Sequence, residues 1–353
     1  MTIQHTMNEN WHLTVWGVRG SFPTPETEYL EYGGNTSCFS LLCGGELVIF
    51  DAGSGLAALG DALAAGQYPA GIPFAVCHGT GPAALDAAFP KKYRIHVFLS
   101  HFHLDHIMGL FLFQPFYNPD AQIHLYGPAC GETGFQERLV SLVAQPLWPL
   151  GFGEFPADIH FHQISPGACF PLARTDIKVC TMGGNHPGGS LYYRLEDGHH
   201  SLVYALDCEL EGQIQTALAD FVRKVDLCVW DANFTSKDLK TGWGHSTWEQ
   251  GLALGQETGV ETMLMTHYSR EYTDAFLREQ ERLARTACGQ DLPVLEQHLD
   301  RPHPSALEQT ANRSQPLPLD QAADSQHSQT PDQATGKKRI TCHFARERME
   351  IKF

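Results

Sequence analysis

The chain of 353 residues is predicted to fold as an α/β protein, a four-layer αββα sandwich in which two sheets pack face to face and helices cover their outer faces. Two observations predict this fold. Short strand-like runs fill the first half, and strands that alternate with helices follow in the second half. A histidine-rich turn also follows an apolar strand, which is where α/β sheets place their sites. Apolar residues make up 42% of the chain, enough for a substantial core.

The amino-terminal elements are predicted by alternating apolar residues and by the glycines between them. The strands are expected over residues 11–18, 38–43 and 46–50. The second and third of these form a hairpin, because the pair Gly44-Gly45 separates them. The third strand ends at Asp51, and an Ala/Leu-rich helix begins a few residues later.

The remaining elements are predicted from shorter apolar runs bounded by turn residues. Residues 94–100 are rich in β-branched and aromatic side chains and predict a buried strand, and the apolar segment 107–113 fits the first turns of a core helix. The later strands are expected over residues 122–126, 159–164, 177–182, 191–196, 201–206, 226–230 and 261–266. The later helices are expected over residues 132–144, 210–222, 247–257 and 274–286.

Composition divides the chain into one domain and two less regular segments. We expect residues 11–300 to form the domain, with an insertion at about residues 66–92, which are rich in Ala, Gly and Pro and lack a clear period. Residues 301–338 are dominated by Gln, Ser, Pro, Asp and Ala, which predicts a disordered low-complexity loop. In residues 339–353 apolar and polar residues alternate again, and we expect this segment to return to the domain as a terminal strand.

The charge balance limits the partners of this protein. The 24 basic and 40 acidic residues give a formal net charge of −16. Such a surface repels nucleic acid and anionic membranes, so we expect neither as a partner. A small anionic substrate stays possible, because a metal centre reverses the field locally. A homodimer is left open.

The cysteines and the first residues predict a cytoplasmic protein. The ten cysteines include no C-x-x-C pair, and we expect reduced thiols, with Cys180 and Cys228 packed in the core. The first ten residues lack the basic start and apolar centre of a signal peptide. No run approaches the roughly 20 apolar residues of a membrane helix.

The segment Ser100-His-Phe-His-Leu-Asp-His106 is the strongest chemical signal in the chain. It places three imidazoles and one carboxylate within six positions, a set of donors that suits a metal ion. His101 and His103 lie two residues apart and project to the same side of an extended backbone. Asp105 and His106 follow in a turn that aims them at a second point. We therefore expect two adjacent metal sites on one short loop.

Further ligands are expected where other strands give way to loops. His186 lies in the glycine-rich segment 183–189, Asp207 follows the strand 201–206, and His267 follows the strand 261–266. A lone histidine at a strand end is usually structural, but three such endings beside the cluster favour ligation. One pattern accommodates them all, with Asp207 bridging the two metals. Its two triads are His101, His103 and His186 on one metal, and Asp105, His106 and His267 on the other.

This pattern, His-x-His-x-Asp-His followed by a distant His, an Asp and a final His, is similar to that of the metallo-β-lactamase superfamily. Further motifs resemble the branch near RNase Z and the cyclic-nucleotide phosphodiesterases. They are Gly17-Val-Arg-Gly-Ser21, Tyr32-Gly-Gly-Asn-Thr-Ser-Cys38, Phe50-Asp-Ala-Gly53 and Gly242-Trp-Gly-His-Ser-Thr247. The resemblance implies the metallo-β-lactamase fold and two divalent metal ions, zinc first, with manganese or iron as alternatives.

The same resemblance implies roles for two residues outside the triads. Asp231 would orient His245, and His245 would protonate the departing alkoxide as the general acid. The alternative is that His245 is only a helix-entry residue beside the cap Ser246. Trp230 stands where the family has a histidine. Asp51 would hydrogen-bond behind the ligand loop, and a plain turn aspartate is the alternative.

The mechanism implied is metal-assisted hydrolysis by a hydroxide that bridges the two metals. Asp105, one of the ligands, is counted with His245 and Asp231 among the catalytic residues. The candidate substrate-binding residues are Asn35 and Thr36, whose backbone amides could face an anion, and Tyr268, where the family differs.

We expect a phosphodiesterase that acts on a small diester such as a cyclic nucleotide. The alternative is a hydrolase of carboxylic or sulfuric esters, thioesters or lactones on the same site. A tRNA 3′-end endonuclease fits less well, because the chain is acidic. An oxygen-dependent redox enzyme and a non-catalytic sensing module are further alternatives that metal content and turnover would separate.

Overall fold

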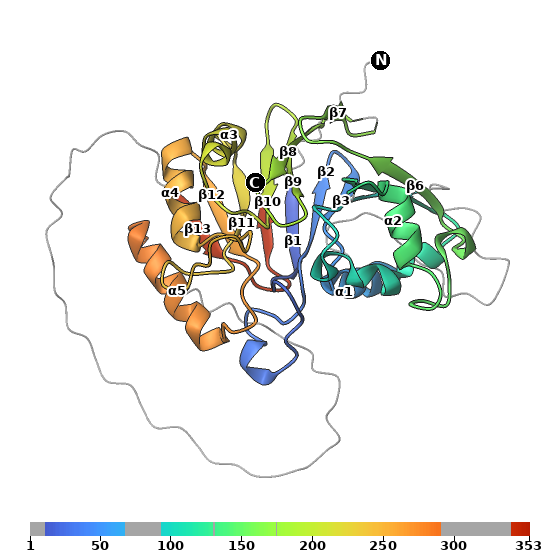
Figure 1. Cartoon of the computed structure of the whole chain (residues 1–353), viewed down its shortest axis with the longest axis horizontal. Helices are drawn as coiled ribbons and strands as arrows, with labels where there is room; N and C mark the ends of the chain where they lie inside the picture. The colour runs from blue at the N-terminus through green and yellow to red at the C-terminus, as the bar shows by residue number, and fades with distance from the viewer. Residues whose placement is uncertain (1–10, 68–92, 130, 174, 291–339) are drawn as a thin grey trace, which may run out of the picture. The chain divides into compact units, whose positions relative to one another are not determined.

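The computed structural model describes residues 11–67, 93–129, 131–173, 175–290 and 340–353. These residues form two mixed seven-stranded sheets with helices on their outer faces, as predicted (Figure 1). Within them, no helix combines the length and the apolar composition that crossing a bilayer requires. Most of the predicted insertion and all of the predicted low-complexity loop lie outside the described residues.

The first sheet contains both ends of the described chain and the strand before the histidine-rich turn. In spatial order its strands are β14 (Glu350–Lys352), β1 (His12–Gly17), β2 (Cys38–Cys43), β3 (Glu46–Phe50), β4 (Tyr93–Phe98), β5 (Ala121–Gly127) and β6 (Asp158–Gln163). The pairs from β14 to β3 are antiparallel, and those from β3 to β6 are parallel.

The second sheet is likewise divided into a parallel part and an antiparallel part. Its spatial order is β13 (Thr341–Phe344), β12 (Thr262–Thr266), β11 (Leu227–Asp231), β10 (Ser201–Ala205), β9 (Ser190–Glu196), β8 (Lys178–Gly184) and β7 (Cys169–Pro171). The pairs from β10 to β13 are parallel, and those from β7 to β10 are antiparallel. The carboxyl ends of β8, β10, β11 and β12 therefore lie at one edge of this sheet.

Aromatic side chains from the two inner faces fill the space between the sheets. The ring of Phe50 on β3 stacks on that of Tyr204 on β10, with centroids 4.9 Å apart, and Phe98 on β4 meets Tyr193 on β9 edge to face at 5.1 Å. All four are fully buried. Burying each ring contributes about 2–3 kcal/mol, so these contacts fix the two sheets against each other.

Five α-helices and several short 3₁₀ turns complete the described fold. Helices α1 (Gly55–Ala64) and α2 (Phe135–Leu142) lie on the outer face of the first sheet, and α3 (Gln213–Phe221), α4 (Trp248–Thr258) and α5 (Asp274–Ala287) lie on that of the second (Figure 1). Helix α4 begins at a capping box, in which Thr247 Oγ1 accepts from the Gln250 amide. The 3₁₀ turns are Thr27–Tyr29, Leu104–His106, Met108–Leu112, Gln114–Tyr117 and Phe152–Glu154.

The prediction of a core helix over residues 107–113 is wrong. A single 3₁₀ turn, Met108–Leu112, forms there instead, and the backbone of Phe113 is extended. Close packing explains the difference, because a Cβ on Gly109 would lie only 2.0 Å from the Gly53 carbonyl oxygen. The apolar residues of the segment are anchored beneath α1, and the following Pro115 has no amide to continue a helix.

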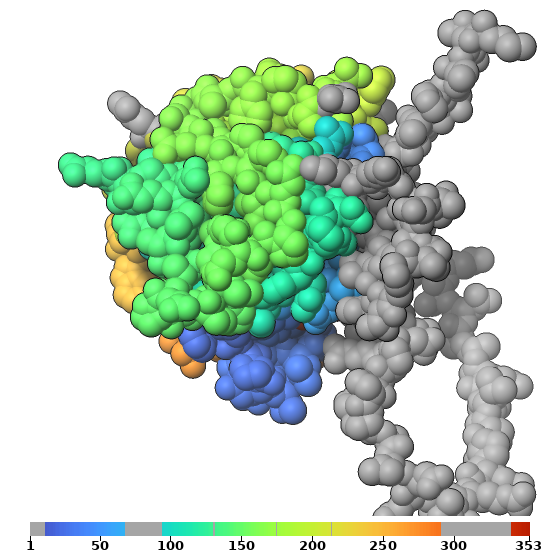
Figure 2. Space-filling view, turned by 90° about the vertical axis from the view of Figure 1, so that its right-hand side faces the viewer, coloured from blue at the N-terminus to red at the C-terminus, as the bar shows by residue number. Residues whose placement is uncertain are grey.

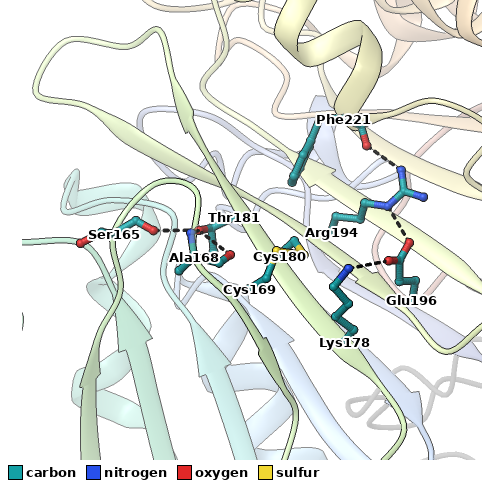
Figure 3. The surroundings of a disulfide bond; sticks show 9 residues. All are labelled: Ser165, Ala168, Cys169, Lys178, Cys180, Thr181, Arg194, Glu196 and Phe221. Atoms are coloured by element: carbon teal, nitrogen blue, oxygen red, sulfur yellow. Dashed lines mark hydrogen bonds and ion pairs between the residues drawn. A yellow bond between two sulfur atoms is a disulfide. The ribbon is translucent and has the colours of Figure 1, made fainter.

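Strand β7 and its disulfide were not predicted. Cys169 on β7 pairs in register with Cys180 on β8, and the two sulfur atoms are bonded (Figure 3). The expectation of reduced thiols therefore fails for this pair, and Cys180 is not a core-packing thiol. Cys228, by contrast, is a buried thiol outside any disulfide, as expected. The short strand was missed because three residues give no readable period.

The carboxyl-terminal segment forms two strands where its alternation predicts one. β13 extends the parallel part of the second sheet, and β14 pairs with β1 at the edge of the first. The two are separated by a turn in which Arg348 has a φ of 68°. One segment thus reaches both sheets.

Candidate metal centre

The histidine-rich turn begins where β4 ends, at the junction of the two sheets. His103 is in extended backbone, and its ring centroid lies 4.5 Å from that of His101. The chain then turns through the 3₁₀ segment Leu104–His106, which sends Asp105 and His106 to a second position. The alternation and the turn thus separate the four side chains into two pairs, as the spacing predicts.

His186 and Asp207 meet the first pair. The ligand atoms of His101, His103, His186 and Asp207 all lie within 4.8 Å of one another. His186 Nε2 is 3.0 Å from His103 Nδ1, and Asp207 Oδ1 is 3.5 Å from His186 Nε2. His186 follows β8 and Asp207 follows β10, so the sheet order brings two strand ends to the turn.

His267 meets the second pair. Its Nε2 atom is 3.2 Å from Nε2 of His106, and Asp105 Oδ2 is 3.3 Å from His106 Nε2 and 3.4 Å from His267 Nε2. A second metal cluster therefore consists of Asp105, His106 and His267. All three side chains are buried.

Asp207 lies between the two clusters and turns one oxygen toward each. Its Oδ1 atom faces the first cluster, 3.8 Å from His101 Nε2, and its Oδ2 atom faces the second, 3.1 Å from His106 Nε2 and 3.4 Å from His267 Nε2. This is the orientation that a bridging carboxylate requires.

Three residues that follow strands at this edge have left-handed backbones. Asp51 after β3, Asp207 after β10 and His267 after β12 have φ values of 57°, 54° and 63°. Residues other than glycine rarely adopt this conformation, which costs roughly 1–2 kcal/mol each. The surrounding packing holds this strain and turns each side chain into the centre.

The donor set fits a divalent metal. His101 Nε2 and Asp207 Oδ2 are buried without a hydrogen-bond partner, and two pairs of imidazole nitrogens face each other at 3.0 and 3.2 Å. Burial lowers the pKa of His101 well below its usual range, so its lone pair is free. Imidazole and carboxylate donors suit zinc, manganese and iron. A metal ion bound between such facing nitrogens would take the place of protons there and coordinate both lone pairs.

Charge is distributed unequally over the two clusters. Burial lowers the pKa of His103 and of His186, which keeps both rings neutral. Burial alone would also lower the pKa of His106, but the carboxylates of Asp207, Asp105 and Asp51 outweigh it and raise that pKa well above its usual value. A metal entering the second cluster therefore replaces protons that the histidines hold.

His245 and Asp231 form a dyad beside the clusters. His245 Nδ1 donates a hydrogen bond to Asp231 Oδ2, 2.9 Å away, and the His245 ring lies 5.3 Å from that of His186 and 5.2 Å from that of His267. Burial lowers the pKa of His245, but the Asp231 carboxylate outweighs it and raises the pKa. The imidazole is thus held in one orientation and favours its protonated form.

Asp51 lies behind the ligand turn, where the sequence places it. Its Oδ2 atom accepts from His106 Nδ1 at 2.7 Å, from Tyr204 Oη at 2.8 Å and from Ser100 Oγ at 2.9 Å, and Oδ1 accepts from the Ser100 amide at 2.7 Å. These bonds fix the His106 ring so that Nε2 faces the second cluster.

The three candidate substrate-binding residues are engaged in contacts within the fold. Thr36 and Tyr268 are fully buried, and Tyr268 Oη donates to the Met265 carbonyl. The amide and side chain of Asn35 donate to the Glu347 carboxylate. The prediction that these residues contact substrate is therefore wrong. Asn35 links the loop 33–36 to Glu347 of the carboxyl-terminal segment, whereas Thr36 bonds to Ser54.

Glu209 and Ser21 support residues of the site, and sequence analysis did not identify either of them. The Glu209 carboxylate accepts from the amides of Gly242 and Gly244, which shapes the loop before His245. The Ser21 amide donates to Asp105 Oδ2 at 2.7 Å. The motifs around Ser21 and His245 gave a signal for these loops, whereas nothing in the sequence marks Glu209.

Comparisons with known proteins agree with this geometry. A ribonuclease Z of Methanosarcina acetivorans is 24% identical over 319 residues, covering 74% of this chain and 88% of that protein. A 3′,5′-cyclic-nucleotide phosphodiesterase of Aliivibrio fischeri is 28% identical over 165 residues, or 42% of this chain and 49% of that one. The metallo-β-lactamase fold protein YhfI of Bacillus subtilis superposes with a TM-score of 0.59 over 98% of this chain and 100% of its own, at 15% identity, which shows the shared fold.

The family model described as "Beta-lactamase superfamily domain" matches residues 82–268. That range includes both metal clusters and the His245–Asp231 dyad. Because the match spans more than half of the chain and the site supplies the donors of a metal centre, the protein belongs to the metallo-β-lactamase superfamily and is a metal-dependent hydrolase.

Proposed function

We propose that the protein is a dinuclear phosphodiesterase that acts on a small phosphodiester such as a cyclic nucleotide, with His245 as the general acid. The observation that carries this proposal is the 2.9 Å bond between His245 and Asp231 beside both metal clusters. An alkoxide leaves phosphorus slowly unless it is protonated, whereas a thiolate needs no acid. A positioned imidazole is therefore most useful to a diesterase with a poor leaving group.

Seven side chains would hold the two ions. His101, His103 and His186 would bind one, Asp105, His106 and His267 the other, and Asp207 both. When bound, divalent ions such as Zn²⁺ lower the pKa of a coordinated water and neutralise charge that builds on the phosphoryl oxygens. Burial of six of these residues excludes bulk water from the donors.

The protein's own residues handle the leaving-group proton. Asp231 occupies Nδ1 of His245, so the mobile proton is presented from Nε2. The Asn233 amide donates to Asp231 Oδ1 at 2.9 Å and the Cys208 amide to Oδ2 at 3.2 Å, so the carboxylate cannot rotate away. Protonated His245 Nε2 would then donate to the departing oxygen.

The relatives support diester chemistry, and the charge of the chain favours a small substrate. One is named a ribonuclease and another a cyclic-nucleotide phosphodiesterase, and both names denote the hydrolysis of phosphodiesters. A net charge of −16 opposes binding of a long polyanion such as RNA. A small diester would need only the metal centre and its immediate surroundings.

The test measures turnover by metal-quantified protein on a panel of esters. The panel contains bis(p-nitrophenyl) phosphate, cyclic AMP, cyclic GMP, p-nitrophenyl acetate and a thioester. We expect hydrolysis of the phosphodiesters, and loss of about 10²–10⁴-fold in kcat on cyclic nucleotides in His245→Ala. His199→Ala, at an exposed histidine in the β9–β10 turn, is the matched control. Activity confined to the acetate and the thioester would overturn the proposal.

A further inference from the structure

A cavity of about 400 Å³ opens beside the first metal cluster. His101 and His103 line it, together with the segments 164–166 and 187–191. Its size is that of a small-molecule site. His245 does not line it, although His245 lies beside the same clusters.

Among the described residues that line this cavity there is no lysine, arginine, aspartate or glutamate. Phe102, Pro128, Ile164 and Pro166 contribute apolar surface, and Phe102 is supported by the buried ring of Phe135 at 5.9 Å. A charged group placed against these apolar walls, away from the metal ligands, would lose water and find no charged side chain to pair with. An uncharged ring such as a phenyl group or a nucleobase would instead bury apolar surface against these walls.

The position of His245 decides which end of the substrate enters the cavity. The leaving oxygen must reach His245 to be protonated, and the cavity lies on the His101–His103 side of the centre. In an acyclic diester, the ester group that remains on phosphorus therefore faces the cavity.

The wall 164–166 is held in place from β8. Thr181 Oγ1 donates to the Ser165 carbonyl at 2.8 Å and accepts from the Ala168 amide at 3.1 Å, as Figure 3 shows. The Cys169–Cys180 disulfide joins the same two segments one residue further along. This part of the molecule belongs to the face seen in Figure 2, which the green segments containing β6, β7 and β8 largely form.

The same strand positions the metal ligand. β8 carries Cys180 and Thr181, ends at Gly184, and is followed by His186. The wall and one ligand of the first cluster are thus fixed to a single strand, which sets the width of the cavity relative to the centre.

We propose that this cavity binds an uncharged, ring-bearing ester group of the substrate, and that the wall 164–166, positioned by Thr181 and the Cys169–Cys180 disulfide, determines specificity for that group. The proposal rests on the phosphodiesterase function proposed above. It makes Ser165 and Ile164 specificity-determining residues, and Thr181 a positioning residue.

The test compares two diesters with the same leaving group, phenyl p-nitrophenyl phosphate and methyl p-nitrophenyl phosphate, on the metal-loaded full chain. Wild-type protein is expected to favour the phenyl ester by about 10-fold or more in kcat/KM, because only that ester fills the cavity. Ser165→Asp places a carboxylate at the wall and should lower the phenyl-to-methyl ratio about 10-fold, whereas the isosteric, uncharged Ser165→Asn should retain most of it.

A binding measurement separates this proposal from the proposed function. Calorimetry of diphenyl phosphate and dimethyl phosphate reports occupancy without turnover, and Ser165→Asp should weaken the diphenyl ester selectively. If neither diester is hydrolysed but diphenyl phosphate binds and Ser165→Asp weakens it, the phosphodiesterase function fails and the cavity stands. A wild-type phenyl-to-methyl ratio near one with equal affinities, or equal losses for both esters in Ser165→Asp, overturns the cavity proposal.

Two further variants test the wall itself. The Cys169→Ser/Cys180→Ser double variant and, independently, Thr181→Val should each raise KM for the phenyl ester more than for the methyl ester. A purely structural role would lower kcat for both esters together. Thr181→Val keeps the disulfide and so remains informative if the double variant does not fold.

Discussion

His186 Nδ1 donates a hydrogen bond to the backbone carbonyl of Gly244, 2.9 Å away, and so joins the first metal cluster to the loop that carries His245. Gly244 has a φ of +79°, and a Cβ added there would lie 2.2 Å from His186 Nδ1. The absence of a side chain at Gly244 is what permits the contact. Nearby Gly242 has an almost identical φ of +80° but open space around it.

The two glycines, Gly244 and Gly242, provide a matched test of the contact between His186 and Gly244. Gly244→Ala is expected to displace His186 and weaken metal binding about 10–100-fold, since the residue orients a ligand. Gly242→Ala carries the same backbone strain, about 1–2 kcal/mol, without the clash, and should retain its metal. Metal content after dialysis against defined zinc concentrations measures the difference. Equal losses in both variants would show that strain alone is responsible.

Asp207→Asn is expected to reduce the occupancy of both metals, because one carboxylate oxygen faces each cluster. His186→Ala should affect mainly the first cluster. Inductively coupled plasma mass spectrometry of the purified variants gives bound metal per chain. Asp220→Asn, an exposed aspartate on α3 that pairs with Arg223, is the control and should not change the metal content. Full occupancy in Asp207→Asn would contradict a bridging role.

Asp51→Asn should lower metal affinity about 10–100-fold although Asp51 is not among the proposed ligands. The neutral amide no longer fixes the His106 ring through the 2.7 Å bond to Nδ1. Tyr204→Phe removes only the phenol bond to the same carboxylate and should have a smaller effect. A zinc competition titration with a chromogenic chelator measures both variants, and a larger effect in Tyr204→Phe would refute the explanation.

A second group of histidines, far from the clusters, predicts acid sensitivity. The ring of His124 stacks between those of His96 and His160, and burial together with these neighbours lowers its pKa to about 4. The unfolded chain, with a histidine pKa near 6.5, therefore binds more protons between about pH 6.5 and pH 4. The stability that depends on neutral His124 is complete above about pH 6.5 and is lost as the pH falls toward 4.

His124→Phe keeps the stack and removes the titration. Between about pH 7.5 and pH 5, wild-type protein should lose about 1 kcal/mol more unfolding free energy than the variant, after allowance for solvent screening of a half-buried ring. Urea unfolding followed by circular dichroism measures both. Identical losses in the two proteins would show that His124 does not account for the acid sensitivity.

The local features of this protein could be predicted from short stretches of sequence. Alternation and glycine pairs located most strands, and the spacing of His101, His103, Asp105 and His106 predicted two clusters from one turn. Such patterns act over a few residues, where backbone geometry alone fixes the direction of a side chain. The apolar segment 107–113 shows the limit, because its packing against Gly53 overrides its helical pattern.

Only the tertiary structure decided which distant side chains converge and which do not. The sheet order brings His186, Asp207 and His267 to one edge, and left-handed backbones turn Asp207 and His267 inward. The same packing buries Tyr268, pairs Cys180 with Cys169 and opens a cavity beside His101. Strand order and register depend on contacts between residues far apart in the chain, so no local pattern specifies them.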